Sequence, residues 1–467
     1  MKYIKSKKHK RYRFPKDCEE GLPYTEVIED GKRIKVCENF EKYFHYSNHF
    51  SINFSSSIIH SKFLRSQFIL NNIPRFLNLP EYYNENREIK IEINDKIDEI
   101  IIGEGISGLS ALENCKNCIL ISPNFDDEIF LDPLCKDCSL KDKIKSIIKN
   151  NSNKIVYGRF IGRFDEGLVF RLKDNYLVIR KPAKVILASG SRFLPPVFPG
   201  NDLPGIISRR MYLKFLNLFK NVVVIGSTDD AIRTALISKS KIFLKKGTEN
   251  FSKKYLELAE NEGIDILEVN ELKASRKGKK IVLYHDYGKE IVDAIVFAIV
   301  RQPRIEIANN LGIEYNFYHK SHIYLPVHNI NGKVNDNYYV TGGMRGIYDY
   351  ELSFLSGKII FNEAIDEFYA ELKETYLYHY YNKRGEEESS SISPYFFGNG
   401  YVCECEDIKL KDVEEQYKKG YRTVEEMKRT LGISTGYCQG KICSFLVGDY
   451  LNSNKLITFR SPLYSMW

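Results

Sequence analysis

A glycine-rich turn between a strand-like run and a helix-like run constrains the fold of this chain more than any other feature. The segment from Asp98 to Ala111 reads DEIIIGEGISGLSA. Gly103 permits a tight turn, Gly105 lets the backbone approach a pyrophosphate, and Gly108 lets the new helix pack against the strand. Backbone N–H groups at the helix start, around Ile106 and Ser107, can bind phosphate oxygens. The turn predicts a dinucleotide site, and a vestigial turn is the alternative.

The end of the next strand-like run, Cys118 to Ser122, bears on the choice of nucleotide. Dinucleotide-binding domains usually carry an acid there, which holds the ribose hydroxyls. Here Ser122, Pro123 and Asn124 stand at that end. Ser122 or Asn124 could bond a hydroxyl without charge. FAD, NAD and another adenine nucleotide such as ATP therefore all remain open.

From Lys96 to about Ala364, short β-branched runs alternate with helical stretches. This alternation predicts an α/β protein with Rossmann-like sheets. We expect four parts: an accessory region (1–95), an FAD/NAD(P)-binding domain (96–381, with a second Rossmann unit at about 219–300), a polar linker (382–398) and a small helical domain (399–467).

Charge and hydropathy exclude several classes of protein. The net charge of +8 is concentrated in the first sixteen residues, which hold eight lysines and arginines. We interpret them as a solvated or partner-docking arm rather than a nucleic-acid site, because basic and aromatic residues are not interleaved. No apolar run reaches the roughly 18 residues of a membrane span, and no secretory signal is recognisable. A cytoplasmic location is expected, with peripheral attachment at the inner membrane face as the alternative.

Ten cysteines are the unusual part of the composition. Without an export signal, disulfides are not expected, and metal or redox chemistry gains weight. Four lie near the C-terminus, as Cys403-Glu-Cys405 and, after 32 intervening residues, Cys438-Gln-Gly-Lys-Ile-Cys443.

The spacer between these pairs predicts two short amphipathic helices. Gly420 should end the first, a capping box of Thr423 and Glu426 should start the second, and Gly432 should follow it. A helical hairpin would bring the four thiolates together. They would suit a [2Fe–2S] cluster or a zinc ion.

Two more pairs have the spacing of a zinc ribbon or rubredoxin, namely Cys115, Cys118, Cys135 and Cys138. They flank opposite ends of one strand-like run, so free thiols are an equal alternative to a second metal site, and a disulfide is the third. Cys18 and Cys37 are predicted to be structural or free.

Several segments resemble, in order, one branch of the flavoproteins with two dinucleotide-binding domains. They are Val185–Pro196 with Ser189 and Gly190, Phe198–Gly205, Val222–Ala235, Tyr339–Gly346 with Gly342 and Gly343, and Ile457–Leu463. The branch comprises the alpha or A subunits of sarcosine oxidase, dye-linked proline dehydrogenase and opine oxidase, and the B subunit of hydrogen cyanide synthase. The C-terminal cysteines are similar to a bacterioferritin-associated-ferredoxin-like [2Fe–2S] domain. Gly343 stands where the family usually carries an acid, and Thr228 and Ala231 replace glycines of the second turn.

The resemblance implies an electron-transferring subunit of an amine or amino-acid dehydrogenase. The cofactors it implies are FAD at the first turn and a [2Fe–2S] cluster, with FMN at a subunit interface as an option. The partners it implies are a beta subunit with its own amine-oxidising flavin and a protein or quinone that accepts the electrons. No residue is marked as a catalytic base. Two rivals remain: a stand-alone NAD(P)H-dependent reductase using Cys135 and Cys138, and a non-catalytic scaffold with a decayed pocket.

Overall fold

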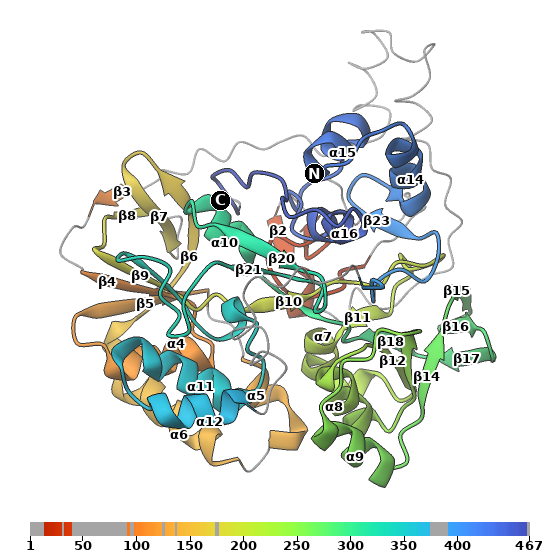
Figure 1. Cartoon of the computed structure of the whole chain (residues 1–467), viewed down its shortest axis with the longest axis horizontal. Helices are drawn as coiled ribbons and strands as arrows, with labels where there is room; N and C mark the ends of the chain where they lie inside the picture. The colour runs from red at the N-terminus through yellow and green to blue at the C-terminus, as the bar shows by residue number, and fades with distance from the viewer. Residues whose placement is uncertain are drawn as a thin grey trace, which may run out of the picture.

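The computed structural model describes residues 14–29, 32–39, 91–93, 98–123, 127–135, 138–172, 177–373 and 391–464. Two α/β lobes lie side by side, and a small helical unit sits above them (Figure 1). The predicted contact Asn124, most of the basic arm, most of the accessory region and the first half of the predicted linker lie outside the described residues.

The first lobe is built on an eight-stranded sheet of order β22-β9-β4-β5-β6-β7-β8-β3. Its first five strands are parallel, β7 is antiparallel to both of its neighbours β6 and β8, and β3 is parallel to β8. Strand β4 is almost wholly buried, as its run of three isoleucines predicts. The strands are β3 (Ile91–Ile93), β4 (Glu99–Ile102), β5 (Cys118–Ser122), β6 (Ile155–Phe164), β7 (Gly167–Leu172), β8 (Leu177–Arg180), β9 (Lys184–Leu187) and β22 (Tyr338–Val340).

Helices of this lobe pack below its sheet in Figure 1. The helix that follows the glycine turn, α4, is buried over its first seven residues. It packs against α11 and α6. The helices are α4 (Ile106–Asn114), α5 (Glu128–Leu131), α6 (Ser139–Asn150), α11 (Tyr350–Lys358) and α12 (Ile365–Lys373).

The second lobe contains a five-stranded parallel sheet of order β11-β18-β12-β13-β14. Strand β11 precedes residue 219, so the sheet begins earlier than the predicted start of the second Rossmann unit. A three-stranded antiparallel sheet, β15-β16-β17, is inserted before β18. The elements are β11 (Ile206–Ser208), α7 (Arg209–Lys214), β12 (Val222–Ile225), α8 (Asp229–Ser238), β13 (Ile242–Lys245), α9 (Lys253–Asn261), β14 (Ile266–Val269), β15 (Leu272–Lys277), β16 (Lys280–His285), β17 (Gly288–Val292) and β18 (Ala294–Phe297).

Short elements join the lobes. Strand β10 (Ser191–Phe193) pairs antiparallel with β19 (Arg301–Pro303), and β20 (Tyr315–Tyr318) pairs antiparallel with β21 (Ile323–Pro326). Helix α10 (Ile305–Asn310) follows β19 and precedes β20 in the sequence. One continuous hydrophobic core includes Phe170 of the first lobe, Phe297 of the second and Phe445 of the helical unit. The three parts are therefore packed as one body.

The helical unit contains the two predicted helices. They are α14 (Leu410–Lys418) and α15 (Val424–Leu431), preceded by β23 (Tyr401–Cys403) and β24 (Ile408–Lys409) and followed by α16 (Cys443–Tyr450). Thr423 and Glu426 form the predicted capping box, and Gly432 takes the left-handed conformation that ends α15. The sequence therefore predicted this hairpin correctly.

The second half of the predicted linker is packed rather than loose. Tyr395 and Phe397 are fully buried, and the Phe397 N–H donates to the carbonyl of Val197. The polar composition that suggested a linker ends at about Ser393, and the aromatic residues after it join the core.

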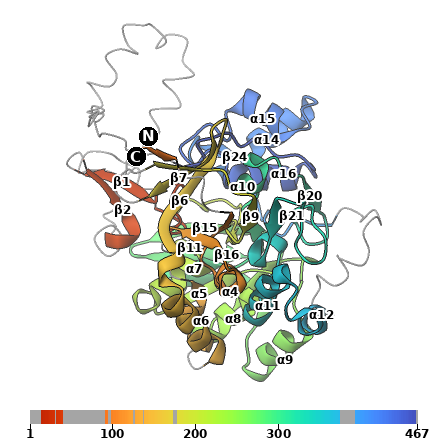
Figure 2. The same cartoon turned by 90° about the vertical axis from the view of Figure 1, so that its left-hand side faces the viewer.

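The N-terminal segment is also part of the core structure. A two-stranded hairpin, β1 (Glu26–Glu29) and β2 (Lys32–Lys35), is followed by a short 3-10 helix (Val36–Asn39). Figure 2 shows the hairpin on the side of β6 and β7, where Glu20 just before it pairs with Arg159 and Arg171. The prediction of an accessory region missed these buried contacts.

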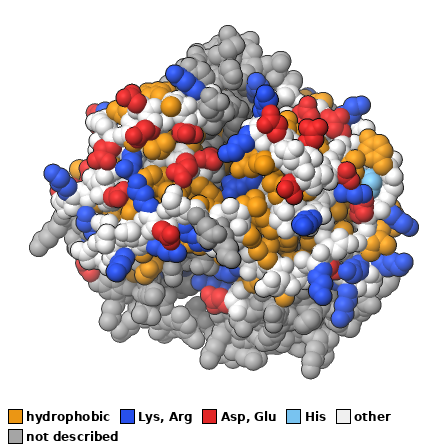
Figure 3. Space-filling view, turned by 90° about the horizontal axis from the view of Figure 1, so that it is seen from below, with side chains coloured by type: hydrophobic (Ala, Val, Ile, Leu, Met, Phe, Trp, Pro, Cys, Tyr) orange, Lys and Arg blue, Asp and Glu red, His pale blue; other side chains and the backbone are white. Residues whose placement is uncertain are grey.

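On the face seen in Figure 3, acidic and basic side chains of the described residues are interspersed among apolar ones. No helix among the described residues is long and apolar enough to cross a bilayer.

Candidate functional site

The first glycine turn has the close contacts that its sequence predicts. Gly103 has a φ of +114°, and a Cβ there would lie 2.3 Å from the carbonyl oxygen of Ala188. A Cβ on Gly108 would lie 2.0 Å from the carbonyl oxygen of Gly103. Only glycine fits either position, so the strand, the turn and α4 can approach as a dinucleotide site requires.

A cleft opens beside this turn. Eight predicted contact residues line it: Gly103, Gly105, Ile106, Ser107, Ser122, Ser189, Gly190 and Gly343. The buried hydroxyl of Ser189 has no hydrogen-bond partner among the described residues, so it is available to a polar ligand. Gly108 and Gly342 do not line the cleft. A Cβ on Gly342 would lie 2.3 Å from the Ser107 hydroxyl, so its role is close packing.

Four arginines that the sequence did not single out also line the cleft. They are Arg159, Arg210, Arg301 and Arg304. Arg304 donates to the carbonyl of Ser189 and to the carboxylate of Glu19, and Arg159 pairs with Glu20. The arginines come from distant parts of the chain, so no local motif could have revealed them.

One acid, Asp127, lies at the mouth of the turn. Its carboxylate accepts the N–H of Ile129 at 3.0 Å, and its Oδ2 atom lies 3.3 Å from the position of a Cβ on Gly105, the residue just before α4. Desolvation raises the pKa of Asp127 above its ordinary value. The backbone of this cleft fits a nucleotide, and a carboxylate faces its phosphate-binding edge.

The second turn has the same topology but a different lining. A Cβ on Gly226 would lie 2.3 Å from the carbonyl oxygen of Ala298, so the strand–helix approach is equally tight. The helix that follows, α8, begins with Asp229 and Asp230. Asp229 accepts the N–H of Ser252 at 2.7 Å. Two carboxylates therefore stand where a second pyrophosphate would meet the helix start.

Buried ion pairs join these carboxylates to the first lobe. Asp132 accepts from Arg209 at 2.7 Å and from Arg233 at 2.5 Å, while Arg301 binds Glu128 at 2.7 Å and Asp230 at 2.6 Å. Burial alone would raise the pKa of Glu128 and Asp230, but the arginines, Arg301 foremost, outweigh it and lower both. We call these six residues the arginine–carboxylate cluster.

The four C-terminal cysteines line one small cavity. Cys403, Cys405, Cys438 and Cys443 are all buried there. Residues of the N-terminal segment cover it, among them Phe14, Lys16 and Pro23. Lys16 pairs with Glu404, and the Tyr24 hydroxyl donates to the carbonyl of Glu404 at 2.7 Å. The structure thus brings together the thiols that the sequence predicted as ligands.

The cavity suits a cluster of two irons. Four buried thiols line it together, and the Ser434 hydroxyl lies 3.6 Å from the sulfur of Cys443. Four thiolates are the ligand set of a [2Fe–2S] cluster and also of a closed zinc site.

A glycine lets the backbone come close to one of these cysteines. A Cβ on Gly436 would lie 2.4 Å from the Cβ of Cys405 and 3.4 Å from its sulfur. A Cβ on Gly440 would lie 2.8 Å from the Ser434 hydroxyl, so Gly440 allows close packing rather than contact with a sulfur.

The nucleotide cleft and the cysteine cavity are neighbours. Glu19 binds both Arg304 of the cleft and Arg192, and Arg192 donates to the carbonyl of Lys441 at 3.3 Å. The Lys441 ammonium donates to the carbonyl of Cys438 at 3.2 Å and lies 4.7 Å from the ring centroid of Tyr464, which lines the cleft. A few buried side chains therefore separate the two sites.

The two C-x2-C pairs do not form a metal site. Cys115 is bridged to Cys118, and Cys135 to Cys138, while Cys18 pairs with Cys37. The structure therefore favours the third alternative, disulfides, for these four residues, and it corrects the general expectation against disulfides. Each bridge closes within its own C-x2-C turn.

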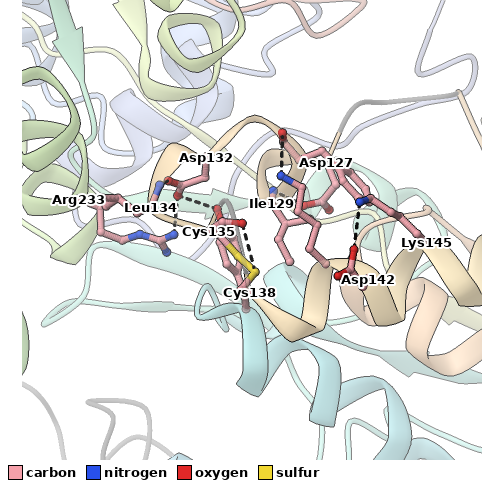
Figure 4. Close-up of a disulfide and its surroundings, with 12 residues drawn as sticks. Asp127, Ile129, Asp132, Leu134, Cys135, Cys138, Asp142, Lys145 and Arg233 are labelled. Carbon is pink, nitrogen blue, oxygen red and sulfur yellow. Dashed lines mark hydrogen bonds and ion pairs between the residues drawn. A yellow bond between two sulfur atoms is a disulfide. The ribbon is translucent and has the colours of Figure 1, made fainter.

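Figure 4 shows the Cys135–Cys138 bridge beside the loop of Asp132, whose carboxylate accepts the N–H of Leu134 at 2.9 Å. Neither cysteine lines the nucleotide cleft. This pair is therefore badly placed for the dithiol role that a stand-alone reductase would need.

Comparison with known proteins agrees with this geometry. Residues 401–453 match the family described as the BFD-like [2Fe-2S] binding domain. The chain thus joins a flavoprotein fold with two dinucleotide-binding domains to a BFD-like [2Fe–2S] domain, which confirms the predicted fold class.

Among solved structures, L-proline dehydrogenase from P. horikoshii is similar, with 23% identity, 81% of this chain and 79% of that chain covered, and a TM-score of 0.58. Thioredoxin reductase from Lactococcus lactis has 16% identity, with 59% of this chain and 100% of that chain covered and a TM-score of 0.47. The disulfide reductase RclA from Escherichia coli has 16% identity, with 58% and 71% covered and a TM-score of 0.44. No curated protein sequence matches the chain.

Proposed function

We propose that this chain is the nucleotide-binding, electron-transferring subunit of a flavin-dependent dehydrogenase or oxidase that acts on amines or amino acids. The observation that carries the proposal is the single cavity lined by Cys403, Cys405, Cys438 and Cys443, within a segment that matches a [2Fe–2S] domain. A nucleotide cleft lies a few side chains away. The likeness of fold to a structure called L-proline dehydrogenase supports the CH–NH class of donor.

The residues of this chain would bind, orient and insulate the cofactors. The first glycine turn and Ser189 would hold an adenine dinucleotide, FAD in this proposal, and the four cysteines would hold the irons. When bound, a flavin takes two electrons as a hydride and a cluster passes them on singly. No sequence motif marks a residue of this chain as a base for amine oxidation, so a beta subunit is proposed to oxidise the substrate, with FMN at the interface as an option and a protein or quinone as acceptor.

The stand-alone reductase is the weaker alternative. It needs a nicotinamide cofactor at the second turn, where Asp229 and Asp230 already meet the helix start. It also needs a dithiol beside the flavin, and Cys135 and Cys138 lie outside the cleft.

Metal analysis of anaerobically purified full-length protein tests the proposal. We expect about two irons and two acid-labile sulfides per chain, with visible absorbance. Cys403→Ser and Cys438→Ser should lose both, whereas Cys135→Ser, a matched change at a disulfide, should keep them. A colourless, iron-free wild type would contradict the cluster, and full-rate oxidation of proline or sarcosine by this chain alone would contradict the two-subunit arrangement.

A further inference from the structure

The carboxylate of Asp127 lies where the first glycine turn should receive a phosphate group. Its Oδ2 atom is 3.3 Å from the position that a Cβ on Gly105 would take. Gly105 is the N-cap of α4, a helix of nine residues that begins at Ile106. The N–H groups at this helix start are those that a dinucleotide turn offers to a pyrophosphate.

Asp127 is held in this place by the short helix that follows it. It is the N-cap of α5, where its Oδ1 atom accepts the N–H of Ile129 at 3.0 Å, and Figure 4 shows the two residues side by side. One carboxylate thus caps α5 and stands beside the start of α4, where a bound anion would lie.

We propose that Asp127 is an internal anion that competes with the pyrophosphate of the nucleotide for the first glycine turn. The inference rests on the proposed nucleotide site and concerns what limits its affinity. Carboxylate and phosphate oxygens accept the same N–H groups, and two anions this close repel each other. A nucleotide with a pyrophosphate therefore binds when the carboxylate has swung away or has taken up a proton.

The charges around Asp127 decide how readily its carboxylate takes up a proton. Desolvation raises its pKa, and the neighbouring carboxylate of Glu128 acts in the same direction. The guanidinium of Arg210, from α7, acts against them. Glu104 of the turn also faces the cleft, and Arg301 is engaged by Glu128. As the pH falls, more Asp127 is protonated, the repulsion disappears, and binding of a pyrophosphate becomes tighter.

Calorimetric titration with ADP-ribose tests this inference. Its pyrophosphate is a diester, so its charge stays constant between pH 5.5 and pH 8. Asp127→Asn should bind ADP-ribose about tenfold more tightly than the wild type at pH 7.5, because a like charge next to the ligand is removed. Affinity of the wild type should rise toward pH 5.5, and that of Asp127→Asn should stay flat.

Two controls isolate the effect. Asp142→Asn makes the same charge change on the exposed face of α6, where the Asp142 side chain is 82% exposed, and should leave the affinity unchanged. Adenosine, which lacks phosphates, should bind all variants equally. Asp127→Ser keeps a capping oxygen for α5 and serves as a second neutral variant if the Asn protein does not fold.

Equal or weaker binding of ADP-ribose by folded Asp127→Asn or Asp127→Ser would overturn the competition, and so would a matching gain for adenosine. Absence of ADP-ribose binding by every variant at every pH would overturn the nucleotide site as well. The iron analysis is independent of both results, so failure of this inference is distinguishable from failure of the proposed electron-transfer function.

Discussion

The two strand–turn–helix units of this chain share a topology and differ in charge. In the first, a Cβ on Gly103 would collide with Ala188, and a cleft opens beside the turn. In the second, a Cβ on Gly226 would collide with Ala298, but Asp229 and Asp230 begin the helix and the arginine–carboxylate cluster surrounds it. Tight backbone packing is thus common to both, and the residues at the helix start decide which turn can accept an anion.

Asp127 of the first unit and Asp230 of the second differ in the direction of their pKa shift. Desolvation raises the pKa of Asp127, whereas Arg301, Arg209 and Arg233 together outweigh desolvation and lower the pKa of Asp230. Desolvation likewise raises the pKa of Asp229. A carboxylate with a raised pKa can be displaced or neutralised at low cost. One that is paired with buried arginines is a permanent part of the structure.

The largest effect should come from breaking the arginine–carboxylate cluster. Asp132→Ala leaves Arg209 and Arg233 without their shared partner in a buried site, and should lower the free energy of unfolding by about 3 to 5 kcal/mol. Urea denaturation measures it. Asp142→Ala, on the exposed surface of α6, is the matched control and should change little. Equal stability of the two variants would mean that the cluster does not lock the lobes together.

A substitution that blocks the first glycine turn should have the next largest effect. Gly103→Ala forces a Cβ to within 2.3 Å of the Ala188 carbonyl oxygen and should destabilise the protein by roughly 2 to 3 kcal/mol. It should also abolish binding of ADP-ribose, since all nucleotide binding is assigned to this turn. Gly278→Ala, at a positive φ with no atom within 4 Å of the added Cβ, measures the backbone cost alone.

The same titrations count the sites. We expect one ADP-ribose per chain and no saturable binding of NADH at the second turn. A second equivalent, or NADH binding that survives Gly103→Ala, would show that Asp229 and Asp230 do not exclude a nucleotide.

Acid should destabilise the folded chain through the arginine–carboxylate cluster. Glu128 and Asp230 have pKa values below their ordinary 4.5 and 3.8 in the folded chain, so the unfolded chain binds more protons in acid. Their stabilisation is complete above pH 4.5 and is lost as the pH falls through the folded pKa values. The urea midpoint, followed from pH 7 to pH 3, should fall steeply below pH 4.5. A flat profile would contradict the lowered pKa values.

The smallest effect should be a gain in stability, whereas the substitutions above cause a loss. The raised pKa of Asp127 means that the folded chain binds its proton more readily than the unfolded one, so the buried charge costs stability at neutral pH. Asp127→Asn should raise the urea midpoint slightly at pH 7 and not at pH 4. A lower midpoint at pH 7 would show that the cap to Ile129 outweighs the charge.

Local sequence predicted the parts of the structure that depend on local geometry. The turn at Gly103 and Gly108, the capping box of Thr423 and Glu426 and the gathering of the last four cysteines follow from spacing, because each needs only neighbouring residues or one hairpin.

The residues that the sequence missed meet across long separations. Arg301 and Glu128 are 173 positions apart, and Arg192 and Glu19 are likewise 173 apart. No spacing rule connects such residues. Asp127 could have been suspected, since an acid soon after the second strand comes close to the first turn, but only the structure shows that its carboxylate lies beside Gly105. The disulfides were not expected because the sequence was interpreted as that of a protein with reduced thiols.

The segments around residues 14–23 and 456–464 enclose the redox centre from opposite ends of the chain. Phe14 and Lys16 close the cysteine cavity, while Tyr464 closes the nucleotide cleft and Leu463 accepts from Lys441 at 2.6 Å. During synthesis, residues 14–23 are made long before residues 401–464, with which they pack. The cysteine cavity and the nucleotide cleft can therefore close only after residues 456–464 have been translated. Deleting either segment should expose both sites to water and oxygen.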